Sequence, residues 1–149
     1  MFKTFFHANI CVRDLDKSLK FYQRLGFKVV QGPFVLEGKD IGQMLGMEHV
    51  KLRAAFLRLG DAPGAAMIDM LEFIDPVVKA TPYPSLHNLG ICRLCFKVDD
   101  IHQSYRDLKD MGVEFVSPPV VKERADGGRT TMFCFKDPDG TFLEIIDGV

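Results

Sequence analysis

The sequence predicts an α+β fold of two βαβββ modules, paired by a pseudo-twofold axis around a half-barrel cleft. Two observations support this prediction. Residues 7–30 align with residues 93–116 at a constant shift of 86 without a gap, and self-similarity over such a length indicates a duplicated unit. Each copy is then followed by two β-prone segments around a turn, so both copies supply the same order of elements.

The middle of each repeat predicts an amphipathic helix. Asp14 stands where an N-cap is needed, and Gly26 stands where the helix must end in a left-handed residue. Asp100 and Gly112 occupy the same places in the second copy. Between these caps the apolar residues recur at spacings of four, three and three, which is the period of one helix face. They are Leu15, Leu19, Tyr22 and Leu25 in one copy and Ile101, Tyr105, Leu108 and Met111 in the other.

The segments on either side of these helices predict strands, because they are rich in β-branched and aromatic residues and are bounded by turn residues. The strands next to the helices are expected at 8–12, 27–30, 94–98 and 113–116. The hairpins are expected at 51–59 and 65–74 around the turn 60–64, and at 129–135 and 141–146 around Asp137-Pro138-Asp139-Gly140.

The predicted domain organisation is a single domain, 1–149, made of modules 1–75 and 88–149. A linker at 76–87, which contains three prolines, joins them. The chain length suits one domain. One module alone leaves a sheet face uncovered, and pairing two modules buries it.

Charge and composition narrow the possible partners. The chain has 19 Lys and Arg against 20 Asp and Glu, and its basic residues form no run. Nucleic acids and membrane surfaces are therefore not expected as partners. No stretch approaches the roughly 18 apolar residues of a membrane span, and the N-terminus lacks the apolar region of a signal peptide. We expect a cytoplasmic protein that binds a small molecule.

The four cysteines, at positions 11, 92, 95 and 134, fall in predicted strands. Buried, reduced thiols are the expected state. Cys92 and Cys95 form a C-x-x-C pattern, but residues three apart in a strand point to opposite faces. This pair is therefore not expected to bind zinc or to close a disulfide.

Carboxylates interrupt the apolar last strand of each module. Glu72 and Glu144 both follow a leucine within a shared Leu-Glu-x-Ile-Asp pattern, and an ionised carboxylate is rarely buried in a strand without a partner. His7 begins the first predicted strand, and its repeat partner is Arg93. The repeat thus predicts that His7, Glu72, Arg93 and Glu144 converge in one cleft.

Three stretches resemble the vicinal oxygen chelate superfamily: residues 7–22 (HANICVRDLDKSLKFY), residues 90–101 (GICRLCFKVDDI) and residues 137–144 (DPDGTFLE). This superfamily includes glyoxalase I, methylmalonyl-CoA epimerase, extradiol dioxygenases, and the fosfomycin and bleomycin resistance proteins. The resemblance covers nearly the whole chain and implies the paired-module fold. One superfold of this kind hosts several chemistries, so the reaction does not follow from it.

The resemblance also implies a metal site, because each repeat-related position supplies one ligand in metal-binding relatives. The matching residues here are His7, Glu72 and Glu144. At the fourth position stands Arg93, whose guanidinium has no lone pair for a metal. Two interpretations stay open. Either the three ligands hold Zn, Ni, Mn, Fe or Co while Arg93 binds substrate, or Arg93 replaces the ion by pairing with Glu72 or Glu144.

The leading functional hypothesis from the resemblance is a metal-dependent lyase, isomerase or epimerase of the glyoxalase type. In it the metal polarises a carbonyl, and Glu144 or Glu72 moves a proton on the adjacent carbon. The alternatives are a metal-free small-molecule-binding or resistance-type protein and an extradiol dioxygenase. A homodimer is expected, and segment 38–50 is expected to form a short helix or lid.

Overall fold

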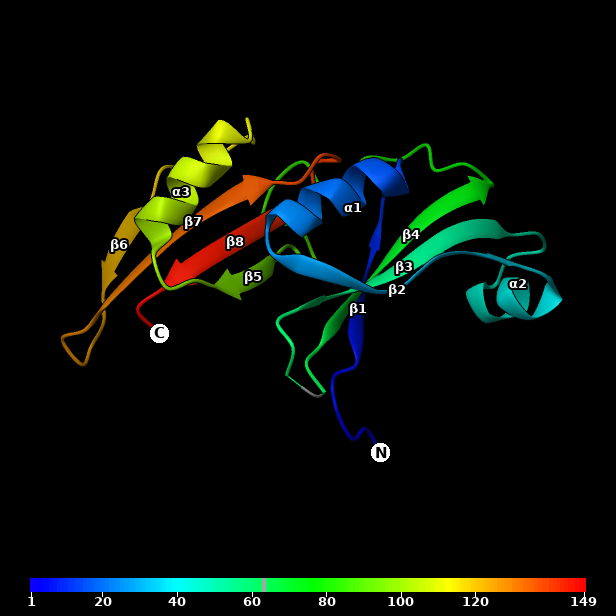
Figure 1. The fold of residues 1–149 in the computed structure, drawn as a ribbon, viewed down its shortest axis with the longest axis horizontal. Helices are drawn as coiled ribbons and strands as arrows, with labels where there is room; N and C mark the ends of the chain where they lie inside the picture. Colours follow the sequence, from blue (N-terminus) through cyan, green and yellow to red (C-terminus); the bar gives the residue numbers. More distant parts are fainter. Residues whose placement is uncertain (63) are drawn as a thin grey trace. The chain divides into compact units, whose positions relative to one another are not determined.

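The computed structural model describes residues 1–62 and 64–149, and the chain divides into two compact units, Met1–Ala80 and Thr81–Val149 (Figure 1). Each unit contains one four-stranded sheet and one of the two helices that the repeat predicts. The α+β class and the two βαβββ modules are therefore confirmed. The boundary between the units falls inside the predicted linker. That the two units form one domain stays a prediction, as does the cleft between them.

The first unit forms a mixed sheet with the strand order β1-β4-β3-β2. β1 runs parallel to β4, and the other pairs are antiparallel. The predicted turn 60–64 includes residue 63, which lies outside the described residues. In chain order the elements are β1 (His7–Cys11), α1 (Leu15–Arg24), β2 (Phe27–Glu37), α2 (Lys39–Leu45), β3 (Lys51–Leu59) and β4 (Met67–Asp75).

The second unit repeats this topology with the strand order β5-β8-β7-β6. β5 runs parallel to β8, as β1 does to β4, and the other pairs are antiparallel. The elements are β5 (Leu94–Lys97), α3 (Ile101–Asp110), β6 (Val120–Glu123), β7 (Arg129–Lys136) and β8 (Phe142–Asp147).

The predicted helix caps are confirmed in both units. The Asp14 carboxylate accepts a hydrogen bond from the Lys17 backbone N–H at 2.9 Å, and Asp100 accepts one from the N–H of Gln103 at 2.8 Å. Each bond satisfies a donor that the first helical turn leaves free. Gly26 follows α1 with φ of 95°, a left-handed conformation that favours glycine.

The second strand of the second unit lies further along the chain than predicted. Strand β6 covers Val120–Glu123, whereas the predicted segment 113–116 forms only an isolated bridge from Phe115 to Phe135. The Phe115 ring packs against Tyr105 of α3 and against Phe133, with 4.6 Å and 5.8 Å between the ring centroids, respectively. Backbone hydrogen bonds from Val116 to Cys134 and from Lys136 to Glu114 join segment 113–116 to β7. The segment thus holds the partly buried Phe115 ring between helix and sheet.

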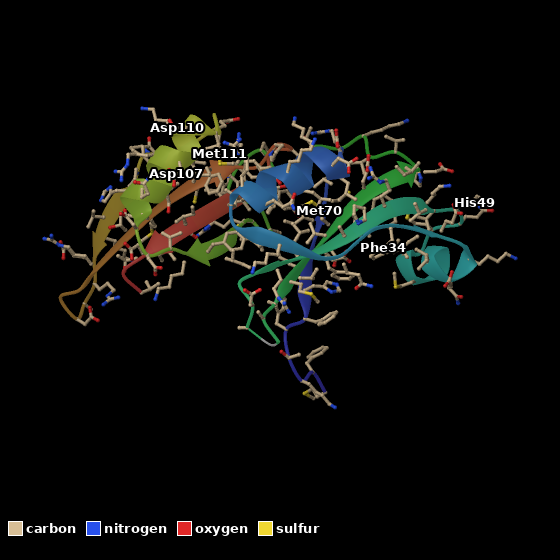
Figure 2. All side chains as sticks on the ribbon, in the orientation of Figure 1. Phe34, His49, Met70, Asp107, Asp110 and Met111 are labelled. Atoms are coloured by element: carbon tan, nitrogen blue, oxygen red, sulfur yellow. The ribbon has the colours of Figure 1, made fainter. Side chains whose placement is uncertain are left out.

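Segment 38–50 contains the expected short helix, α2, which ends at Gly46 with φ of 67°. Its Ile41 packs with Met47 against the buried Leu52 and Ala54 of β3. His49 lies in the loop that follows, at the outer edge of this unit (Figure 2), and its side chain is 84% exposed. The helix covers an apolar part of the sheet, and His49 faces solvent.

The two faces of the first sheet can be told apart by one contact. Arg53 of β3 binds Asp16 of α1, so the face that carries Arg53 is the one that α1 covers; we call it the helix face. Side chains two residues apart on a strand point to the same face, so Ala55 and Leu57 share the helix face with Arg53. The buried Met70 and Ile68 of β4 lie directly opposite Ala55 and Leu57 and therefore share this face as well. The other side is called the far face below.

The same division applies to the second sheet. Tyr105 of α3 packs edge-on against Phe133 of β7 with 5.4 Å between ring centroids, so Phe133 lies on the helix face. Cys134, the next residue, lies on the far face together with its ladder partner Glu144. Among the described residues no helix is long and apolar enough to cross a membrane.

Candidate functional site

The strand register identifies which carboxylates occupy equivalent positions in the two units. In the first unit Asn9 of β1 lies opposite Asp69 of β4. In the second, Cys95 of β5 lies opposite Glu144 of β8. Cys95 is the repeat partner of Asn9, since the two are 86 residues apart. The structural equivalent of Glu144 is therefore Asp69 and not Glu72, the residue that the shared sequence pattern paired with it.

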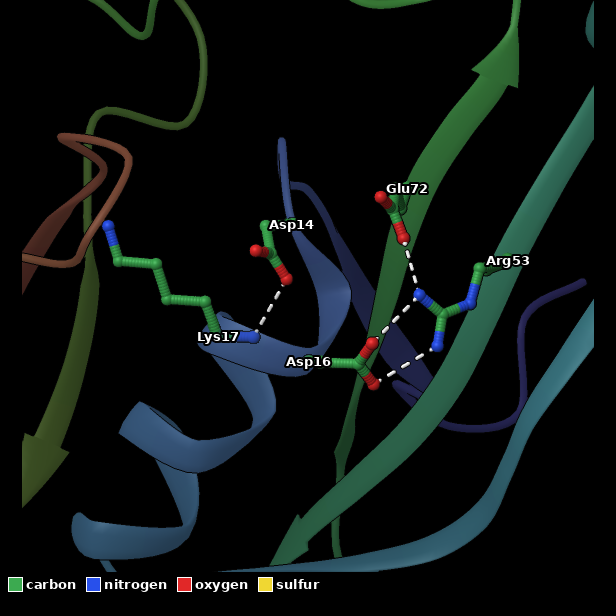
Figure 3. Close-up of polar contacts among 5 residues, drawn as sticks. All are labelled: Asp14, Asp16, Lys17, Arg53 and Glu72. Carbon is green, nitrogen blue, oxygen red and sulfur yellow. Dashed lines mark hydrogen bonds and ion pairs between the residues drawn. The ribbon is translucent and has the colours of Figure 1, made fainter.

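Glu72 lies three positions beyond Asp69 and thus on the opposite side of the sheet. Its Oε2 accepts a hydrogen bond from Arg53 Nη1 at 3.0 Å, and the Arg53 guanidinium also donates to both carboxylate oxygens of Asp16 at 3.0 Å (Figure 3). This bidentate contact lowers the pKa of Asp16. Glu72 belongs to an ion cluster that ties α1 to the helix face.

In the second unit the structure brings Arg93 and Glu144 together. The Nε of Arg93 donates to Oε2 of Glu144 at 2.6 Å, and the side chains are 38% and 10% exposed, respectively. The hydrogen bond to this carboxylate raises the pKa of Arg93 above its ordinary value. The carboxylate is thus neutralised by a guanidinium from within the same unit. This is the contact that the metal-free interpretation expected.

Two thiols flank this ion pair. Cys95 and Cys134 are the ladder neighbours of Glu144 on either side. Burial, followed by the charge of Glu144, raises the pKa of Cys95 to about 11 and also raises that of Cys134. Both stay protonated at neutral pH. All four cysteines are reduced thiols, as expected, but Cys11 and Cys95 are exposed, so the expectation of four buried thiols was wrong.

The far face of the first unit carries a second polar group of side chains. His7 and Asp69 lie there on neighbouring strands, and Asn9 Nδ2 donates to Asp69 Oδ2 at 2.8 Å. Asp69 is only 9% exposed. Burial raises its pKa, while the charge of His7 and the hydrogen bond from Asn9 lower it by less.

Sequence reasoning missed Asp69, although a signal was present. The residue shares its strand face with Met67, Leu71 and Phe73, so it interrupts an otherwise apolar row. A carboxylate at such a position calls for a partner as strongly as Glu72 does. The Leu-Glu-x-Ile-Asp match was the more visible pattern, but it aligns the two modules three residues out of their structural register.

The fold agrees with the relatives of the chain. It belongs to the glyoxalase/bleomycin resistance protein/dioxygenase superfamily, whose family model matches residues 4–145. It is 30% identical over 142 residues to a bleomycin resistance protein of Klebsiella pneumoniae, with 93% of this chain and 87% of that protein covered. It is 29% identical over 143 residues to a probable lactoylglutathione lyase of Vibrio cholerae serotype O1, with 94% and 87% covered.

Solved structures show the same fold. A glyoxalase family protein from Bacillus cereus superposes with a TM-score of 0.88 at 21% identity, over 100% of this chain and 96% of that one. The trypanothione-dependent glyoxalase I of Leishmania major matches with a TM-score of 0.65 at 22% identity, over 98% and 87%. The resemblance to the vicinal oxygen chelate superfamily is confirmed.

The donor groups present do not fit the metal site that the resemblance implied. Arg93 cannot be a ligand, and it holds one oxygen of Glu144. Glu72 faces α1 and binds Arg53. Within neither unit, taken by itself, do the described residues include a group of three or more His, Cys, Asp or Glu side chains arranged to hold a metal ion, whereas catalytic zinc sites use three protein ligands.

Proposed function

We propose that this protein is a small-molecule-binding member of its superfamily that works without a resident metal ion. The observation that carries the proposal is the ion pair between Arg93 and Glu144. A carboxylate as buried as Glu144 needs a cation, and a divalent ion is one way to supply it. In this chain the guanidinium already does so, from the position at which metal-binding relatives place a ligand.

The relatives suggest the first compounds to test. The Klebsiella pneumoniae protein is named for bleomycin resistance and the Vibrio cholerae protein for lactoylglutathione lyase activity. Metal-free bleomycin is therefore a binding probe, and lactoylglutathione turnover is the matched enzymatic assay. A binding protein is expected to retain affinity for its ligand after dialysis against a chelator and to show no turnover when metals are added.

The deciding experiment combines metal analysis with calorimetry. Protein purified without chelator is expected to contain far less than one metal ion per chain, and isothermal titration is expected to give the same ligand affinity before and after chelation. A stoichiometric metal, or ligand binding that disappears on chelation and returns with Ni or Zn, would reject the proposal.

A metal-dependent lyase or isomerase of the glyoxalase type is the second candidate, and one observation favours it. His7 Nδ1 and Asp69 Oδ1 have no hydrogen-bond partner among the described residues, and both atoms are suitable metal donors. Turnover of lactoylglutathione that requires an added divalent ion would establish this candidate in place of the first.

A further inference from the structure

Three buried polar atoms in the first unit have no hydrogen-bond partner among the described residues. They are Nδ1 of His7, Nε of Arg58 and Oδ1 of Asp69. Buried polar atoms are nearly always paired, because leaving one unpaired costs the full desolvation penalty of the group. Three such atoms in one sheet point to a ligand that completes their hydrogen bonds.

The register places these three residues on one face, in two neighbouring rows. His7 of β1 and Arg58 of β3 are both ladder partners of Met67 in the strand between them. Two positions along β4, the next row on the same face contains Asp69. The two nitrogen-bearing side chains thus flank β4 from both sides, and a carboxylate lies just beyond them. All belong to the far face.

Aromatic rings lead from this polar group toward an apolar surface. The ring of Phe56, the ladder partner of Asp69, lies 5.6 Å from the His7 ring and 6.4 Å from the Phe34 ring. Phe34 in turn packs on the buried Leu52 and Ala54 beneath α2. The far face therefore changes from polar to aromatic to aliphatic along its length, which suits a ligand with one polar and one apolar end.

We infer that the far face of the first unit binds a small organic acid that carries a hydroxyl or amino group beside its carboxylate and an apolar tail. Arg58 and His7 hold the carboxylate, and Asp69 Oδ1 accepts a hydrogen bond from the neighbouring hydroxyl or ammonium. The tail lies along Phe56 and Phe34. This inference rests on the proposed function, since it names the class of ligand that the protein would bind.

The chemistry of the three atoms supports this class over others. Arg58 Nε can only donate, Asp69 Oδ1 only accepts when ionised, and His7 Nδ1 can do either. A ligand with a single anionic group would leave Asp69 unpaired, and a purely cationic ligand would leave Arg58 unpaired. A carboxylate with an adjacent donor satisfies all three.

The test uses four matched probes on chelator-treated, full-length protein, with affinities from calorimetry and the site mapped by amide chemical shifts. The probes are 3-phenyllactate, 3-phenylpropionate without the hydroxyl, lactate without the ring, and methyl 3-phenyllactate without the charge. We expect 3-phenyllactate to bind most tightly, with shifts concentrated in β1, β3 and β4. Equal binding of all four, or shifts confined to the second unit, would overturn the inference.

Substitutions separate the roles of the two charged residues. Arg58→Met, which keeps the aliphatic stem, is expected to weaken 3-phenyllactate binding by about tenfold or more. Asp69→Ala, which removes the acceptor oxygen, is expected to abolish the preference for 3-phenyllactate over 3-phenylpropionate. The matched control is Arg53→Met, on the same strand but on the helix face, and its affinity should match that of the unsubstituted protein. An unchanged affinity in folded Arg58→Met would reject the assignment.

The outcomes also separate this inference from the proposed function. Bleomycin binding without metal, together with no binding of any acid, would overturn the ligand class and leave the metal-free binding function standing. Binding of 3-phenyllactate that appears only after a divalent ion is added would do the reverse, because the ligand class would hold and metal independence would fail.

Discussion

Arg93 Nε lies 2.6 Å from Glu144 Oε2, which makes these residues an ion pair between the segment before β5 and the middle of β8. The carboxylate is largely buried and the guanidinium is partly exposed. Removing Arg93 would leave a buried anion without a partner, which is costly. Removing Glu144 would cost less, because solvent can reach the guanidinium.

Replacing Arg93 by alanine is expected to destabilise the second unit by about 1–2 kcal/mol at pH 7. The cost is electrostatic, since the ionised Glu144 loses its partner in a buried position. It should therefore be recovered in part when Arg93→Ala is combined with Glu144→Gln, which removes the unpaired anion. Urea denaturation of the single and the double variant at pH 7 measures the difference. A double variant that is no more stable than Arg93→Ala alone would contradict this account.

Replacing Arg93 by histidine is expected to increase affinity for divalent metals. The substitution removes a cation that repels the ion, releases Glu144 and adds an imidazole ligand. Thermal melting with and without Ni, Zn, Mn or Co should show an upward shift in the variant and none in the unsubstituted protein. A ligand at 100 times its Kd adds about 2.7 kcal/mol to stability. A shift of equal size in both proteins would mean that Arg93 does not replace the metal.

Replacing Asp69 by asparagine is expected to stabilise the fold at neutral pH by about 1 kcal/mol. Burial raises the folded-state pKa of Asp69 above its ordinary value of 3.8, so the native state loses stability as pH rises from below 3.8 through the folded pKa. Asparagine removes this penalty and can still accept the hydrogen bond from Asn9. Denaturation at pH 3 and pH 7 checks the sign, since the gain should be present only at pH 7.

Replacing Asp16 by asparagine is expected to lower the stability of the fold at neutral pH, the opposite of the effect expected for Asp69→Asn. The hydrogen bond and charge of Arg53 lower the pKa of Asp16, so its contribution to stability is present above the unfolded value of 3.8 and is lost as pH falls through the folded pKa. The variant should therefore be less stable than the unsubstituted protein at pH 7 and equal to it at strongly acidic pH. A difference that persists at acidic pH would show that the contact acts through packing instead.

A homodimer is expected in solution. The family resemblance suggests it, and the edge strand β6 exposes Val120 and Val121, which are 51% and 55% exposed. Sedimentation equilibrium at micromolar concentration should give twice the chain mass of 16.8 kDa. A mass near 16.8 kDa would contradict the prediction.

The local elements were predictable because each had a cause within a few residues. The caps at Asp14 and Asp100 and the repeated helix face rest on short-range contacts, and the structure places both helices where the spacing did. Register is different, because it depends on which residues pair across strands that are far apart in the sequence. The assignment of Glu72 therefore went to the wrong face, and Asp69 and Arg58 were missed.

The pairing of Arg93 shows the same limit. Its residue type alone indicated that one of the implied metal ligands was absent, because a guanidinium has no lone pair for a metal. Whether Arg93 pairs with Glu72 or with Glu144 depends on the strand register, and in the structure it pairs with Glu144. The residue types thus predicted an ion pair, but only the pairing of the strands identified the carboxylate.

The raised pKa of Cys95 has a consequence for the reactivity of the second unit. With a pKa of about 11, only about one thiol in ten thousand is a thiolate at pH 7. Alkylating reagents and peroxide attack thiolates, so Cys95 should react slowly even though its side chain is exposed. Burial, followed by the charge of Glu144, thus protects the Cys95 thiol against oxidation, and a variant with glutamine in place of Glu144 should be alkylated faster.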